Sequence, residues 1–342
     1  QSRAEQSRAE QSRAEQSRAE QSRAEWLDNI KGILILAVVF GHLIGGKTSQ
    51  EHNIYGILHY LIYSVHMPMF ILISGYLSKK KWTYKKMLRN YILPYIIFDL
   101  LWVVYSLIRG TVSAAELNVL VPTYVYWYIL CLCLMRIVAF TTVLNKIFLP
   151  ISVVLTIISP LIGKDIWLVL SLGRVALLYP MFYLGRSYLK EFVSKAREKK
   201  ITMVILMSAC ICGELLLLRN HITDITWASH DYPLNMTECL LKYVFMFFVV
   251  GVFTGLVALV PNRKIFLTKW GRNSLLVYLI HSFVIDVLKV VFGKINVEWN
   301  TPFCFAAVLT AVIITEFLSN ERLKKLYDVM MLKIYIIFNL SE

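Results

Sequence analysis

The amino-acid sequence predicts an all-α, polytopic integral membrane protein with about ten transmembrane helices and both termini in the cytosol. Three observations support this fold class. Hydrophobic residues make up 57% of the 342 residues and charged residues only 17%, whereas soluble domains are roughly 25% charged. Many apolar stretches are long enough to cross about 30 Å of hydrocarbon at 1.5 Å per residue. Basic residues gather in alternate loops between these stretches, as in membrane proteins of defined orientation.

Ten apolar segments are the candidate spans. The fifth is the shortest of them. The segments lie near residues 29–46, 54–77, 91–109, 121–143, 147–162, 166–188, 201–218, 239–260, 274–293 and 302–318.

The net charge of +14 has an uneven distribution that sets the orientation. Fifteen or more Lys and Arg residues follow segments two, six, eight and ten, against about five in the opposite loops. The positive-inside rule therefore places the rich loops in the cytosol and the 219–238 loop outside, within a cell (inner or plasma) membrane. That outer loop could line a substrate entrance or be an ordinary polar loop. Because the basic residues separate apolar segments, the expected partner is the lipid bilayer and not nucleic acid.

The ends of the chain differ from its centre. Residues 1–25 are five copies of QSRAE, electrically neutral and without an apolar stripe, so we expect a disordered extension; an interaction arm is the alternative. Residues 26–320 form the predicted transmembrane domain, and residues 321–342 a cytosolic or interfacial tail. Six scattered cysteines indicate neither a disulfide framework nor a metal site. Oligomeric state stays open, a homo-oligomer included.

Two histidines in the first two apolar segments are the main candidates for chemistry. His42 and His66 are ionisable groups at membrane depth, where such groups are costly and usually mark a pathway or reactive site. Counted from the predicted inner helix ends, both lie near the middle of the membrane. A neutral imidazole can take a proton from a hydroxyl group. The alternative is a structural polar contact between helices.

The residues around these histidines resemble a known family. WLDNIKGILILAVVFGH (26–42) is similar to the first-helix signature of the membrane acyltransferases called acyltransferase-3, a basic residue followed by ten residues and His. Lys31 stands where Arg is usual, a form more similar to the branch related to fucose 4-O-acetylases. Further resemblances follow in order: HMPMFILISGY (66–76), KKMLRNYILPY (85–95), FYLGRSY (182–188) and GRNSLLVYLIH (271–281).

The resemblance implies an O-acyltransferase that moves an acyl group, usually acetyl, from cytosolic acetyl-CoA to a hydroxyl of a cell-surface or lipid-linked glycan, such as capsule, O-antigen or exopolysaccharide. His42 matches the motif histidine and is the expected general base. Lys31 is expected at the donor, at the inner end of its helix. The CoA phosphates need cations; the candidates are Lys85, Lys86 and Arg89, which could equally only set topology.

Other residues have weaker predicted roles. His66 is expected to position the acceptor or polarise the thioester, and Ser74 with Gly75 to allow close approach to the donor. Ser74 as an acyl-enzyme nucleophile is an alternative without a recognisable triad. The remaining candidates for substrate binding are Trp127, Arg174 and His281. Trp127 belongs to an aromatic run that would by default be an interfacial belt.

Two other classes of function fit the helices. A transporter or flippase of a glycan or small polar substrate would also contain intramembrane charges. No inverted repeat or pair of Gly/Pro-interrupted helices is visible, which counts against it. A non-catalytic membrane scaffold would leave both histidines without a role.

Overall fold

The described residues form helices and no strands, which confirms the all-α class. The computed structural model describes residues 25–45, 54–79, 83–113, 118, 120–219, 235–293 and 301–338. Residues 1–24 of the predicted QSRAE extension and residues 220–234 of the outer loop lie outside the described residues.

Each predicted segment corresponds to a helix. The helices are α1 (Glu25–Ile44), α2 (Ile54–Leu77), α3 (Tyr84–Met87), the π-helix η1 (Leu88–Ile92), α4 (Leu93–Arg109), α5 (Trp127–Val138), α6 (Thr142–Ile162), α7 (Lys164–Leu168), η3 (Val169–Ser171), α8 (Leu172–Glu198), α9 (Lys200–Arg219), α10 (Met236–Leu259), α11 (Phe266–Arg272), α12 (Ser274–Gly293), α13 (Thr301–Leu318) and α14 (Glu321–Ile337). Within the described residues, eight are long and apolar enough to span a membrane, with α3 to α4 and α7 to α8 each counted as one. The bent pair α13–α14 (51°) makes a ninth.

The fourth predicted span is shorter than expected. We predicted 121–143, but α5 covers only Trp127–Val138, about 18 Å at 1.5 Å per residue. Pro122 cannot donate a helical hydrogen bond. The backbone N–H and the hydroxyl of Thr123 both donate to Asp99, at 2.8 and 2.7 Å. These contacts hold the chain before Trp127 in an irregular conformation.

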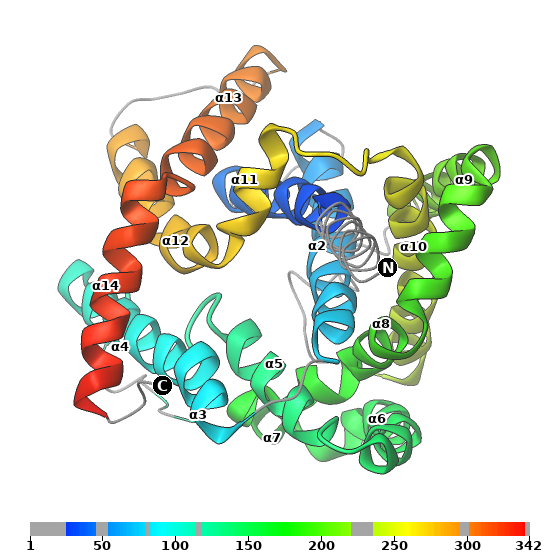
Figure 1. Cartoon of the computed structure of the whole chain (residues 1–342), viewed down its shortest axis with the longest axis horizontal. Coiled ribbons are helices and arrows are strands. Elements are labelled where there is room, and N and C mark those ends of the chain that lie inside the picture. Colours follow the sequence, from blue (N-terminus) through cyan, green and yellow to red (C-terminus); the bar gives the residue numbers. More distant parts are fainter. Residues whose placement is uncertain are drawn as a thin grey trace, which may run out of the picture.

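The first two helices lie in the interior of the bundle. In the apolar window of α1, 67% of the residues are buried, against 11% in α9. Figure 1 shows the dark-blue α1 and the lighter blue α2 near the centre, with the green α9 on one side and the orange-to-red α13 and α14 on the other. The histidine-bearing segments are therefore covered by other helices and do not face lipid as a whole.

Two glycines let α2 and α8 cross closely. A Cβ at Gly75 would lie 2.1 Å from the carbonyl oxygen of Phe182, and one at Gly185 only 1.8 Å from that of Leu72. Small residues permit such backbone approach between membrane helices. Gly75 thus has a packing role, and its predicted contact with the donor stays a prediction.

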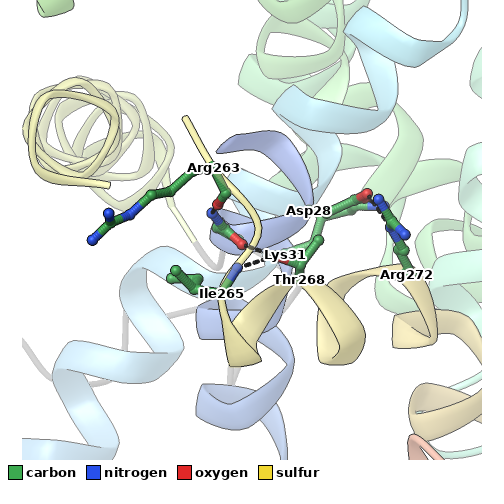
Figure 2. A network of polar contacts seen from close by, with 7 residues as sticks. Asp28, Lys31, Arg263, Ile265, Thr268 and Arg272 are labelled. Atoms are coloured by element: carbon green, nitrogen blue, oxygen red, sulfur yellow. Dashed lines mark hydrogen bonds and ion pairs between the residues drawn. The ribbon is translucent and has the colours of Figure 1, made fainter. Parts of the chain in front are cut away.

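The Asp-Asn-x-Lys-Gly stretch joins α1 to α11 and the residues before it (Figure 2). The amide of Asn29 donates to the carbonyl oxygens of Pro261 and Arg263, both at 3.0 Å, and accepts from the Thr268 hydroxyl at 2.6 Å. Asp28 pairs with Lys31 at 2.7 Å and with Arg272 at 3.3 Å. This motif fixes the start of α1 against the second half of the chain.

Candidate active site

His42 lies in the last turn of α1, two residues before its end at Ile44. The helix begins and ends earlier than the predicted segment 29–46, so His42 lies nearer the end of α1 than the apolar run suggests. Its predicted depth near the middle of the membrane stays a prediction. Nδ1 of His42 is 3.2 Å from the hydroxyl of Tyr63 on α2 and 3.1 Å from that of Tyr124. The imidazole of His281, on α12, has its centroid 5.1 Å from that of His42.

The tautomer of His281 follows from its neighbours. Its Nδ1 is 2.8 Å from the carbonyl oxygen of Tyr278 and 3.2 Å from that of Val277. Carbonyl oxygens only accept hydrogen bonds, so Nδ1 carries the proton and Nε2 of the neutral ring has a free lone pair. Among the described residues this buried Nε2 has no hydrogen-bond partner. His281 therefore offers an unused acceptor beside His42.

His66 is arranged in the same way. Its Nδ1 lies 2.6 Å from the carbonyl oxygen of Ile62, so Nδ1 donates and Nε2 is the acceptor. Its ring centroid is 4.9 Å from that of Tyr63, which also contacts His42. The structure thus gathers the three predicted histidines, His42, His66 and His281, around Tyr63 and Tyr124. We call this group the histidine cluster.

The sequence did not single out the tyrosines of the cluster. Tyr63 lies three residues before His66, and this spacing of about one helical turn could have indicated that the two side chains lie on the same face of the helix. Tyr124 belonged to the aromatic run expected at the interface. His59 was also missed; its ring centroid is 4.0 Å from that of Tyr63.

A cavity of about 240 Å³ lies toward the start of α1. We call it the Lys31 cavity; its lining includes Lys31, Ser74, Tyr91, Tyr128 and Tyr278. Ser74 Oγ and the Tyr128 hydroxyl are 3.1 Å apart. Lys31 is eleven residues before His42, about 16 Å along the helix axis, so it does not contact the cluster. Tyr278 connects the two, since its ring centroid is 5.8 Å from that of His281.

The predicted phosphate-binding cations lie beside this cavity in the sequence. Lys85 and Lys86 are in α3, and Arg89 is in η1 directly before two cavity residues, Asn90 and Tyr91. Such π-helical turns are rare and often occur at functional sites. Here Pro94 lacks the N–H that would bond the carbonyl of Asn90.

Three contacts in and around η1 hold Arg89 against α14 and Arg136 against Tyr91. The Arg89 guanidinium lies 5.6 Å from the ring of Tyr335 on α14, and the Tyr335 hydroxyl donates to the Arg89 carbonyl at 2.9 Å. Arg136 of α5 lies 5.4 Å from the ring of Tyr91. The tail helix therefore packs on the basic segment.

Trp127 and Arg174 contact each other. The Arg174 guanidinium lies 4.8 Å from the Trp127 ring centroid, and its Nη1 is 3.5 Å from Ser171 Oγ. Neither is among the described residues that line the Lys31 cavity. Their predicted contact with substrate stays a prediction.

A second cavity, of about 460 Å³, borders the cluster through Tyr124. We call it the Tyr124 cavity; its lining includes Trp102, Asn118, Thr123, Tyr124 and Asp165. Trp102 and Ser106 come from the second half of α4, whereas Asn90 and Tyr91 of the Lys31 cavity precede that helix. The two cavities therefore lie toward opposite ends of α4.

A bundle of apolar helices, with a cluster of histidines between two cavities, is the architecture of a multi-pass membrane protein. Comparison with known proteins is more specific. The acyltransferase-3 family model, described as an acyltransferase domain, matches residues 24–317. The chain belongs to this family, and it is an acyltransferase.

Two curated relatives are similar to the chain over most of its length. The chain is 26% identical over 333 residues to the nodulation protein NolL of Mesorhizobium japonicum, covering 84% of this chain and 83% of the relative. It is 25% identical over 322 residues to the nodulation protein NolL of Sinorhizobium fredii, covering 84% of each. No solved structure gives a significant match.

Proposed function

We propose that this protein is a membrane O-acetyltransferase that moves acetyl from cytosolic acetyl-CoA to a hydroxyl of a cell-surface or lipid-linked glycan. His42 is the general base. The observation that carries the proposal is the position of the histidine cluster, which borders the Lys31 cavity through Tyr278 and the Tyr124 cavity through Tyr124. Donor and acceptor can then reach one group of bases from different sides.

The surroundings of His42 suit a base. When Nδ1 carries the proton, it donates to a tyrosine oxygen, and the lone pair of Nε2 is free to take the proton of the acceptor hydroxyl. Tyr63 and Tyr124 then fix the ring, as the third group of a catalytic triad does. His281 Nε2 can accept a hydrogen bond from the acceptor.

The Lys31 cavity suits the donor. The cations Lys85, Lys86 and Arg89 precede its mouth residues, and the phosphates of CoA need positive charge. The thiol end of the donor would extend past Lys31 and Tyr128 toward Tyr278 and His281. This proposed direction of entry and the basic loops support a cytosolic position for the start of α1 and for both termini, in the inner or plasma membrane.

Lys31→Ala is expected to raise the apparent KM for acetyl-CoA several-fold and to leave Asp28 paired with Arg272. Loss of one exposed charge contact is typically worth about 0.2–1 kcal/mol, and a partly buried one more. Lys31→Arg keeps the charge and should recover most of the affinity. Initial rates at varied acetyl-CoA measure both. An unchanged KM in Lys31→Ala would remove Lys31 from the donor site.

The direct test of the function uses the full chain in lipid nanodiscs. Acetyl-CoA labelled in its acetyl group is supplied with surface glycan of the producing cells after mild base has removed its O-acetyl groups. Label is expected in the glycan as base-labile ester, located by NMR. Glycan binding or movement across vesicles without any ester formation would instead support a transporter.

A further inference from the structure

The chain before α5 is irregular and lines a cavity. In membrane proteins, irregular backbone is tolerated only where it is buried in protein or lines a water-filled cavity. Asn118, Pro122, Thr123 and Tyr124 line the Tyr124 cavity. Tyr124 also has a positive φ of 44°, which costs about 1–3 kcal/mol for a residue other than glycine. The fold accepts this cost at the residue that touches His42.

Tyr124 connects the cavity to the reactive centre. Its hydroxyl is 3.1 Å from His42 Nδ1, and its ring stacks on Trp102, with centroids 4.8 Å apart and an interplanar angle of 9°. Asp99 holds the adjacent Thr123 by two hydrogen bonds. A molecule in this cavity would therefore contact an aromatic wall and lie next to the base.

We propose that the Tyr124 cavity binds the sugar unit that receives the acyl group, a proposal that rests on the function proposed above. Sugars present apolar C–H faces and several hydroxyls. Trp102 and Tyr124 supply the aromatic surface, while Asn118 and Asp165 supply polar groups that bind hydroxyls. At about 460 Å³, the cavity is within the usual range for small-ligand sites.

The Tyr124 cavity and the proposed donor site differ in the sign of their charge. Asp165 is the charged side chain in the described lining of the Tyr124 cavity, and its carboxylate would repel the phosphates of CoA. The Lys31 cavity has the opposite sign, with Lys31 in its lining and three cations beside it in the sequence. A neutral polyol is compatible with Asp165, because a carboxylate accepts hydrogen bonds from hydroxyls.

The test measures donor and acceptor kinetics separately in nanodiscs, with labelled acetyl-CoA and the base-treated glycan as probes. Trp102→Ala and Asp165→Asn are each expected to raise the apparent acceptor KM about tenfold, on the scale of aromatic and charged hydrogen-bond contacts. The acetyl-CoA KM should stay within twofold. Asp328→Asn, on α14 and paired with Lys324, is the matched control and should change neither.

The possible outcomes distinguish a wrong assignment of the cavity from a wrong function. No ester formation by the unaltered protein would overturn the function. Normal transfer with an unchanged acceptor KM in both variants would overturn only the assignment of the cavity. If Trp102→Ala does not fold, the acceptor KM of Asp165→Asn decides. A raised acetyl-CoA KM in Asp165→Asn would also contradict the proposal.

Discussion

Replacing His42 by Ala is expected to lower acetyl transfer by about 10²–10⁴-fold, the usual contribution of a positioned general base. His42 Nδ1 is within 3.2 Å of two tyrosine hydroxyls, so the variant loses both the proton acceptor and the group that these tyrosines orient. The rate of label transfer at saturating acetyl-CoA and glycan measures the loss.

Two further variants show whether this effect is chemical. His42→Gln keeps hydrogen-bonding capacity but cannot take a proton, so it should be as inactive as His42→Ala. His59→Ala removes a neighbouring histidine whose ring contacts Tyr63, and it should retain most of the activity. Thermal unfolding midpoints and acetyl-CoA binding should match the unaltered protein in all three. Transfer at the normal rate by His42→Ala would remove His42 as the base.

Replacing Gly185 by Ala is expected to destabilise the protein by more than the usual ~1–3 kcal/mol of an overpacked core. The new Cβ would lie 1.8 Å from the carbonyl oxygen of Leu72, and a backbone atom cannot move aside unless α2 and α8 separate. Because α2 also carries Tyr63 and His66, separation would disturb the histidine cluster. We expect a lower thermal midpoint in nanodiscs and a matching fall in transfer.

Gly213→Ala is the matched control for this substitution. Its Cβ would meet the ring of Phe248 at 2.9 Å, and a side chain can rotate away at small cost. Gly75→Ala, whose Cβ would lie 2.1 Å from the Phe182 carbonyl oxygen, should behave like Gly185→Ala. Equal midpoints for Gly185→Ala and Gly213→Ala would show that the helices do not cross as closely as described.

The sequence predicted the membrane class and most helices well. Apolar length depends on local composition alone, so segments such as 54–77 agree with the observed helix α2 (Ile54–Leu77). The fourth segment failed because Asp99, far away in sequence, binds Thr123 and holds the chain out of a helix. A contact between two separate segments cannot be predicted from local composition.

His42 and His66 could be predicted from the sequence for a physical reason. An ionisable side chain in an apolar run is costly, so His42 and His66 stood out, and the order of motifs related them to acyl transfer. Lys31 was singled out by the resemblance to the first-helix signature, and only the structure shows that it is paired with Asp28.

By itself, the sequence determined the fold class, the family and the histidines, because these depend on hydrophobicity and residue order. Only the tertiary structure decided what lies next to His42. Tyr63, Tyr124 and His281 reach it from α2, the segment before α5, and α12, and their side chains meet only when those helices pack. The two cavities likewise arise between elements distant in sequence, where packing and not local pattern sets the space.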